Sequence, residues 1–582
     1  MSFFGELRRR NVFRVGIAYL AVVWVLIQVA DVVLPNVGAP GWITEALIYS
    51  SALGFPLALT LAWFYELTPE GIKASADTDA VEAVKSTGRK IDFAIIGLLV
   101  LAVGVLLVRS PLEDQALVLS NSVAVLPFDN LSPNADDAYF ALGMHDTILN
   151  ELARLKDMNV IGRTSVLAYA DGQTPISEIA EALNVETVME GSVQYADGRI
   201  LVTAQLIDPI TNTHLWSANY DREFADIFAV QADIATNIAN ALEAEFSLEE
   251  QESIEKVPTD SPAAYGLYLR ALISTNRESY VPDLNQAIAL DPDFAIAYVE
   301  RAARSLPRLI GLMTNTASDE ALEVERSITE DAERALTLDP TLGGAHAVLA
   351  GVHWANWRGA DAEQAFQRAL ELSPKNVNVL TLYGEFKVRR YEYAEAIRLI
   401  RQAIELDPNN LYPLSELGAA NRFSSDWDAS AAILREIANR EPSQLGNIGW
   451  NLGMAFVEAS RGNAAEALTR LQVVEQVGTE RVDRLAQLAL GYLLAGSPDD
   501  AVRIFTQFEE RAIRERISDG WWALAYVAVG NYEEALQRIE SAVSERVTLD
   551  QTPLFLLSSN SWGDPELDTP EFRELLDHLW ID

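Results

Sequence analysis

Few residues of this chain have the types and spacing that catalysis requires. The five histidines lack the spacing of an HExxH metal motif, and no cysteine is present to supply a thiolate nucleophile or a metal ligand. No glycine-rich phosphate loop follows the apolar stretch SVAVLPF, and Ser132, Ser165 and Ser192 have no organised His and Asp neighbours in the sequence. We therefore expect no catalytic, cofactor-binding or metal site. A triad assembled only in three dimensions stays open as an alternative.

The residues that we expect to contact a ligand lie in the C-terminal half, where the sequence repeats. Pro374, Pro408 and Pro442 are spaced by 34 residues each, so they align at one position of the repeat. The first helix of each unit usually lines the concave face of such an array. For each candidate, the alternative is an ordinary solvated or packing residue. The aligned positions on that face are Asn378, Thr381, Glu385, Arg389, Tyr412, Ser415 and Arg422.

Pairs of helices must position these side chains, and the spacing of small residues predicts them. Ala467, Ala501 and Ala535 also differ by 34 residues, which is the period and residue placement of tetratricopeptide repeats. Small residues let helices approach closely, and proline ends a unit where the chain reverses. We expect seven or eight units over 261–546, stacked into an all-α superhelix with a concave face, and a C-terminal cap over 547–582.

One unit of the array is longer than the others. Pro292 and Pro340 lie 48 residues apart, which predicts an insertion near LPRLIGLMTNTASD. The stretches GNAAEAL, SPDDAVRIF and GNYEEAL predict the second helices of successive later units.

Residues 121–246 have the alternating pattern of a compact α/β domain. Its two longest runs meet at Asp197-Gly198, which is a strong hairpin signal because both positions favour positive φ angles. The expected order is a strand (SVAVLPF), a helix (DDAYFALGMHDTILNELARL), a strand (MNVIGRTSV), a helix (ISEIAEALNV), the hairpin, a strand (THLWSANYDRE) and a helix (IFAVQADIATNIANALEAEF).

The motifs of this domain resemble a known family. SVAVLPFDNLS, ARLKDMNVIGRTSV and ISEIAEALNVETVMEGSVQ are similar to the module shared by the amino-terminal domain of TolB and FlgO-like envelope proteins. The same module is found in bacterial membrane proteins with tetratricopeptide repeats, and the similarity covers about 121–240. It implies a protein-contact domain rather than a catalyst. Relatives often carry a class III adenylate cyclase or winged-helix domain, and we expect neither in this chain.

Three apolar stretches precede this domain, over about 12–34, 43–65 and 91–109. Each is long enough for a transmembrane helix, since a bilayer core of about 30 Å needs roughly 20 helical residues. We therefore expect a membrane domain over 1–110 with three transmembrane helices.

The distribution of basic residues predicts the orientation. Arg8, Arg9 and Arg10 precede the first stretch, the loop 35–42 has no basic residue, and no Lys or Arg lies between Arg109 and Arg154. By the positive-inside rule the N-terminus is cytoplasmic and the C-terminal domains are periplasmic, in a bacterial inner membrane.

The net charge limits the possible partners. The formal net charge is −40, and residues 1–110 carry nine basic and nine acidic residues, so the excess belongs entirely to the rest of the chain. Nucleic acid is disfavoured because phosphate binding needs clustered Lys and Arg. The expected partners are the lipid bilayer and a protein or peptide in the repeat groove; a homo-oligomer stays open.

Together these features favour a non-enzymatic scaffold or adaptor, anchored in the inner membrane, that binds envelope proteins or peptides on the extracytoplasmic side. The alternative is a transmembrane signalling subunit that couples an outer ligand to a cytoplasmic or membrane partner. The expected fold class is multidomain: three transmembrane helices, a small α/β domain and an all-α repeat superhelix.

Overall fold

The computed structural model describes residues 119–545, apart from 135–136, 245–246, 275, 314–318, 357, 479–480 and 516. Before residue 119 it describes only 19, 23, 51, 54–55, 65–68 and 71–74. The chain divides into two compact units, Met1–Glu113 and Asp114–Asp582, and each is described by itself.

In the first unit the structure describes a small antiparallel pair of strands, β1 (Tyr65–Thr68) and β2 (Gly71–Ala74). The prediction of three transmembrane helices needs correction. None of the helices that the structure describes combines the length and the hydrophobicity needed to cross a membrane. Tyr65, the last residue of the predicted span 43–65, lies in β1. Most of the spans 12–34 and 43–65, and all of 91–109, fall outside the described residues.

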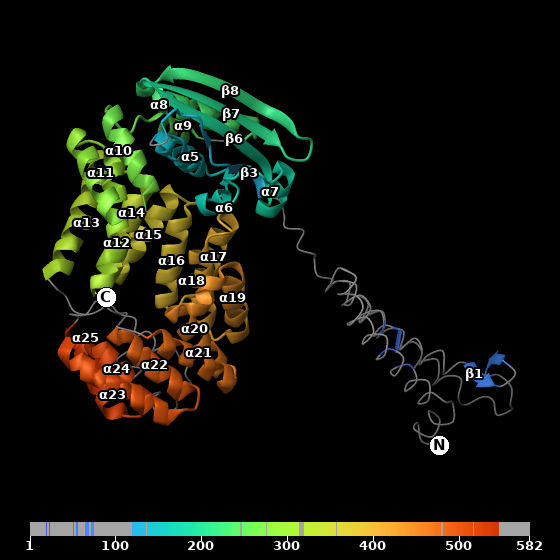
Figure 1. The fold of residues 1–582 in the computed structure, drawn as a ribbon, viewed down its shortest axis with the longest axis vertical. Coiled ribbons are helices and arrows are strands. Elements are labelled where there is room, and N and C mark those ends of the chain that lie inside the picture. Colours follow the sequence, from blue (N-terminus) through green and yellow to red (C-terminus); the bar gives the residue numbers. More distant parts are fainter. Residues whose placement is uncertain are drawn as a thin grey trace. The chain divides into compact units, whose positions relative to one another are not determined.

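The second unit begins with an α/β domain whose six-stranded sheet has the order β5-β3-β6-β7-β8, with the short β4 paired to β6 (Figure 1). β3 pairs parallel with β5 and β6, whereas β6, β7 and β8 form an antiparallel meander. The strands are β3 (Leu119–Val125), β4 (Asp129–Asn130), β5 (Asn159–Val160), β6 (Val185–Ala196), β7 (Arg199–Asp208) and β8 (Thr213–Glu223).

The expected hairpin is present between β6 and β7. Asp197 and Gly198 have φ angles of 51° and 74°, which are the two positive values of a type I′ turn. Apolar residues alternate along β7, with Ile200, Val202 and Ala204 buried. These side chains belong to the same core as helices α5 (Ala138–Ala153) and α8 (Ile227–Ala241).

One predicted strand of this domain is mostly wrong. Within MNVIGRTSV only Asn159–Val160 is a strand, and the chain then turns into a short helix, α6 (Arg163–Leu167). The helix ISEIAEALNV is present as α7 (Ile176–Leu183) and ends at Asn184 in the left-handed conformation.

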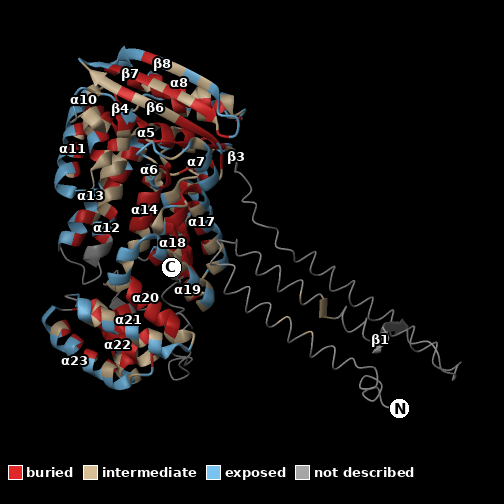
Figure 2. Cartoon of the chain, turned by 45° about the vertical axis from the view of Figure 1, so that its right-hand side comes forward, coloured by how far each residue is buried: buried red, intermediate tan, exposed pale blue. Residues whose placement is uncertain are grey.

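After α9 (Leu248–Glu255), the described residues of 262–545 form eight helix pairs. Figure 2 shows buried residues concentrated where the helices meet. The first helices are α10 (Pro262–Ile273), α12 (Ala295–Met313), α14 (Gly343–Ala355), α16 (Val377–Arg389), α18 (Leu411–Phe423), α20 (Ile448–Ser460), α22 (Val482–Leu494) and α24 (Asp519–Ala528). The second helices are α11 (Arg277–Leu290), α13 (Asp319–Leu338), α15 (Gly359–Leu372), α17 (Tyr393–Leu406), α19 (Trp427–Arg440), α21 (Ala464–Val477), α23 (Pro498–Glu515) and α25 (Tyr532–Glu545).

The residues that predicted the repeat are those that let the helices pack. Ala467, Ala501 and Ala535 lie on successive second helices and are completely buried. At Gly384 a Cβ atom would lie 2.5 Å from Cγ1 of Ile400, so only glycine permits this approach of α16 to α17. The chain thus has the tetratricopeptide-type superhelix expected from its period.

Asparagine starts several first helices. The side chains of Asn376, Asn410 and Asn447 accept hydrogen bonds from backbone N–H groups in the first turns of α16, α18 and α20. The first two differ by the regular 34 residues, but Asn447 lies three residues later than the period requires. The 3-10 segment Pro442–Gly446 lies between α19 and α20, where this register shift occurs. The 48-residue unit differs in another way, because its extra residues lengthen α12 and α13.

The α/β domain contacts the repeats within the second unit. Gly162, which precedes α6, donates its N–H to the carbonyl of Leu406 at 2.6 Å. Lys375 Nζ donates to the carbonyl of Met158 at 2.7 Å. Leu269 of α10 packs so closely on Gly143 of α5 that a Cβ there would lie 2.7 Å from it.

Candidate functional site

The first helices form a row along the repeat array. α16 packs on α18 and α20 packs on α22, while each second helix, such as α17, packs on the first helix that follows it. Stacked helix pairs of this kind curve so that the first helices line the concave side. Residues of a first helix that face neither its partner nor its neighbour are therefore the ones that a ligand in the groove would meet.

The structure brings together four of the seven predicted groove residues. Glu385 and Arg389 are half-buried on α16, and Tyr412 and Arg422 lie on α18. The hydroxyl of Tyr412 donates to Oε2 of Glu385 at 3.1 Å, and Nη2 of Arg389 lies 3.9 Å from Oε1 of the same carboxylate. We call these four residues, with Glu416, the groove cluster.

The other three predicted residues lie differently. Thr381 is completely buried, and its hydroxyl donates to the carbonyl of Val377 in its own helix at 2.7 Å. It is a packing residue and cannot meet a ligand. Asn378 and Ser415 are exposed, and Ser415 lies one turn from Tyr412 on α18. A role for either residue in ligand contact stays a prediction.

Glu416 was missed by the sequence analysis, although it lies four residues after Tyr412 and thus on the same side of α18. The pKa of Glu416 is raised to about 8, first by burial and then by the negative charge of Glu385. The nearby guanidinium groups of Arg389 and Arg422 act in the opposite direction. A carboxyl with such a pKa can change its protonation when a charged ligand enters.

Burial also shifts the pKa values of two other members of the cluster, Arg422 and Tyr412. It lowers the pKa of Arg422 to about 10, with Glu416 opposing this effect and Arg389 adding to it. The pKa of Tyr412 is raised, first by burial and then by Glu385 and Glu416. Yet 42% of Tyr412 is exposed to solvent. A side chain that protein surrounds on most sides while solvent still reaches it lies in a concave surface.

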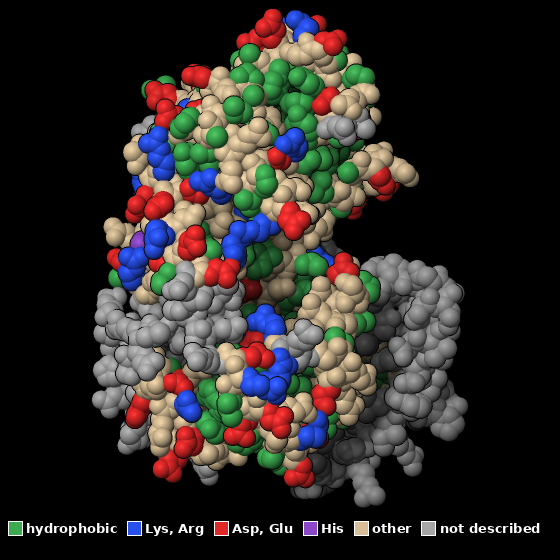
Figure 3. Space-filling view, turned by 60° about the vertical axis from the view of Figure 1, so that its left-hand side comes forward, with side chains coloured by type: hydrophobic (Ala, Val, Ile, Leu, Met, Phe, Trp, Pro, Cys, Tyr) green, Lys and Arg blue, Asp and Glu red, His purple; other side chains and the backbone are tan. Residues whose placement is uncertain are grey.

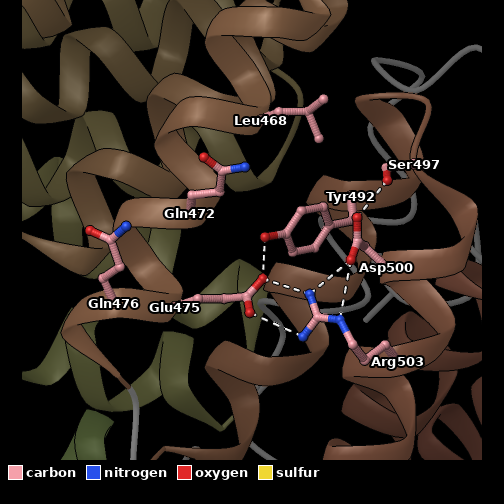
Figure 4. A pocket seen from close by; sticks show the side chains of 8 residues that line it. All are labelled: Leu468, Gln472, Glu475, Gln476, Tyr492, Ser497, Asp500 and Arg503. Carbon is pink, nitrogen blue, oxygen red and sulfur yellow. Dashed lines mark hydrogen bonds and ion pairs between the residues drawn. The ribbon is translucent and has the colours of Figure 1, made fainter.

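A second hollow, of about 350 Å³, lies among α21, α22 and α23 (Figure 4). Arg503 joins Glu475 at 2.8 Å and Asp500 at 2.9 Å, and the hydroxyl of Tyr492 donates to Glu475. Burial alone would raise the pKa of Glu475, but the hydrogen bonds from Arg503 and Tyr492 lower it. Ser497 Oγ completes the network by donating to Asp500 at 2.7 Å. Because these groups satisfy one another, the network joins adjacent repeats and leaves little for a ligand.

Comparisons with known proteins identify a protein that is similar to part of this chain. A region of the chain is similar to "Putative adenylate cyclase 3" of Rhizobium meliloti (strain 1021). The two are 37% identical over 205 residues, which is 34% of this chain and 35% of that protein. The chain thus matches about a third of the length of this relative. No family model matches the chain, so the resemblance to TolB amino-terminal and FlgO-like modules stays a prediction.

Several solved structures resemble parts of the chain. They include PilF of Pseudomonas aeruginosa, at 18% identity over 36% of this chain and 92% of that one, with a TM-score of 0.28. The TPR protein YrrB is 16% identical over 37% of this chain and 97% of its own, with a TM-score of 0.26. A human IFIT1 dimer is 15% identical over 72% and 98%, with a TM-score of 0.34. At such scores the fold assignment rests on the chain's own period and helix pairing.

The match to a protein named as a cyclase contradicts the prediction that this chain is not an enzyme. That prediction rested on linear motifs, and linear motifs do not detect residues that only the fold brings together.

Proposed function

We propose that the repeat array is a protein-interaction scaffold whose groove binds a protein segment or peptide. The observation that carries this proposal is the groove cluster. Five polar and charged side chains from two adjacent first helices converge on one concave surface, and Tyr412 remains 42% exposed there. Such a surface offers hydrogen bonds and charge pairing to an extended segment, supported by fixed helices.

The partner of this scaffold is proposed to be an envelope protein or peptide met on the extracytoplasmic side. That location rests on the resemblance of residues 121–240 to the modules of TolB and FlgO-like envelope proteins. Protease accessibility in intact and opened cells would test it.

A blocked groove tests the proposed function. Ser415 is exposed on α18 beside the cluster, so Ser415→Trp places a large ring in the groove. Thr506→Trp is the matched control, because Thr506 is exposed on the second helix α23. We expect partners that co-purify with the full chain from its host to be lost with Ser415→Trp and kept with Thr506→Trp. Partners retained equally by both variants would contradict a groove function.

A second candidate function is adenylate cyclase activity, which the name of the Rhizobium relative favours. Incubating the purified full chain with ATP and Mg²⁺, and measuring cyclic AMP by mass spectrometry, tests it. Product formed in proportion to the amount of protein would support this candidate. Absence of product at high protein concentration would contradict it for the chain alone.

A further inference from the structure

Two arginines of the groove lack a carboxylate partner of the kind that several other arginines of the array have. Arg301, Arg435 and Arg503 each pair with an acidic residue on another helix. Among the described residues, neither Arg422 nor Arg484 has a carboxylate oxygen within 4 Å of its guanidinium.

These arginines are also poorly solvated. Nε of Arg422 is buried and has no hydrogen-bond partner in the part of the chain that the structure describes. Burial lowers the pKa of Arg484, with Asp483 opposing and Arg481 adding to the effect. The hydrogen bond that Arg484 donates reaches Gln487, a neutral acceptor, at 3.0 Å. Burying a cation without a carboxylate in direct contact is unfavourable, and an anion that enters the site would compensate for it.

The two guanidinium groups converge on one helix. Arg422 comes from α18, and its Nη1 lies 3.4 Å from where a Cβ of Gly453 would be. Arg484 comes from α22, and its Nη2 lies 3.8 Å from where a Cβ of Gly449 would be. Both glycines lie on α20, four residues apart, so they share one face at a spacing of about 6 Å. α20 therefore has no side chain of its own at these two points, and a cation from another first helix lies beside each, with Asn447 Oδ1 also 3.3 Å from the Cβ position of Gly449.

The opposite end of the groove cluster is acidic. Glu416 lies on α18, about one interhelical distance, or ~10 Å, from α20, and the Glu385 side chain reaches toward α18 from α16, where it accepts a hydrogen bond from Tyr412. An extended peptide covers that distance in about three residues, at ~3.3 Å each. The two carboxyl groups, together with the net charge of −40, also disfavour a polyanion such as nucleic acid. On the face in Figure 3, acidic and basic side chains lie side by side, with no continuous basic patch in view.

We propose that the groove across α16, α18, α20 and α22 binds an extended peptide with a charge at each end of this path. An Asp or Glu side chain of the peptide pairs with Arg422 and Arg484 over Gly449 and Gly453. A Lys or Arg side chain about three residues away pairs with Glu385 and Glu416. This inference rests on the proposed function of the groove and specifies the chemistry of its partner.

The test uses a random 12-residue peptide library displayed on phage and selected on the purified full chain. Peptides whose binding is lost with Ser415→Trp are the groove binders. We expect them to contain an acidic and a basic residue two to four positions apart. Replacing the acidic residue of such a peptide by its amide should weaken binding at least tenfold by fluorescence anisotropy.

A double-mutant cycle assigns that effect to the arginines. In the variant Arg422→Gln with Arg484→Gln, we expect the acidic peptide and its amide to bind equally weakly. If this variant folds poorly, the comparison of the acidic peptide with its amide on the unchanged protein still tests the inference. Groove binders without an acidic residue, or a tenfold loss that persists in the double variant, would overturn the inference but leave the groove function standing. A selection that yields no peptide sensitive to Ser415→Trp would count against both.

Discussion

The carboxylate of Asp407 accepts hydrogen bonds from the backbone N–H and the hydroxyl of Ser165, at 2.9 and 2.5 Å, across 242 residues of sequence. Asp407 ends the second helix α17, and Ser165 lies in the first turn of α6 in the α/β domain. Both residues are buried, with 3% of Asp407 and none of Ser165 exposed. The backbone N–H of Asn409 donates to Ser165 Oγ at 2.9 Å. The polar groups of the loop after α17 and of the start of α6 therefore pair with each other.

Asp407→Ala should weaken this interface. The substitution leaves the buried N–H and hydroxyl of Ser165 without their acceptor, so we expect a loss of about 2–3 kcal/mol in the free energy of unfolding. Urea denaturation followed by circular dichroism measures it. Glu441→Ala is the matched control, because Glu441 is 34 residues further on at the same repeat position and is exposed. Equal stability of the two variants would show that the contact contributes nothing.

Gly162→Ala tests the same interface without removing a charge. A Cβ atom at Gly162 would lie 2.5 Å from Cγ of Asp407, a buried group that cannot move freely. We expect a destabilisation of about 1–3 kcal/mol, together with faster proteolysis of the segment 247–260, which contains α9 and precedes the first repeat helix. Gly446→Ala, where no atom lies within 4 Å of the added carbon, should leave both measurements unchanged. Indistinguishable behaviour of the two alanine variants would contradict the close approach.

Gly384→Ala should destabilise the repeats themselves. The added methyl group would lie 2.5 Å from Cγ1 of Ile400 and 3.3 Å from the carbonyl oxygen of Ala396, so α16 and α17 would have to separate. A loss of about 1–3 kcal/mol is expected in urea denaturation. A wild-type midpoint for this variant would mean that the two helices are less closely packed than described.

Glu416 predicts a specific pH dependence of stability. Because burial and Glu385 raise its pKa in the folded state, its contribution to stability is fully present below about pH 4.5 and is lost as pH rises toward 8. Glu416→Gln has no such ionisation. From pH 5 to pH 8.5 the glutamine variant should gain about 1 kcal/mol relative to the wild type, a modest value because solvent reaches the groove.

Denaturation midpoints at the two pH values measure this difference. Glu405→Gln, at an exposed position of α17, is the control and should follow the wild type. Parallel pH profiles of the wild type and Glu416→Gln would show that Glu416 ionises in the groove as it does in the unfolded chain.

The repeats were predictable because their period depends on local packing. A proline or a small residue is required once in each unit, so Pro374, Pro408 and Ala467 indicated the period and the pairing of the helices. Thr381 was wrongly predicted to face the groove, because on a first helix the residues that face the groove and those that pack on a neighbouring helix lie close together in the sequence. Arg484 was missed because the three-residue shift before α20 breaks the alignment on which the candidates were based.

Other features depend on contacts that sequence patterns do not report. The stretch RTSV has β-branched residues and was expected to be a strand, but it becomes α6. Asp407, which is distant in the sequence, accepts the N–H of Ser165 in its first turn. Hydropathy likewise predicted transmembrane helices at 12–34, 43–65 and 91–109, but none of the described helices is both long and hydrophobic enough to span a membrane, and Tyr65 pairs with Ala74 in a β-hairpin. At Ser165 a tertiary hydrogen bond, and at Tyr65 cross-strand pairing, accompany the conformation that the sequence pattern did not indicate.

Site-specific photocrosslinking tests the central claim, that the concave face formed by the first helices is the binding surface. A benzophenone amino acid replaces Ser415 on α18 or Thr506 on α23 in the full chain, which is then irradiated in its host. Crosslinks to a distinct protein segment from position 415, absent from position 506, are the predicted result. Crosslinks of the same yield and identity from both positions, or from position 506 alone, would contradict it.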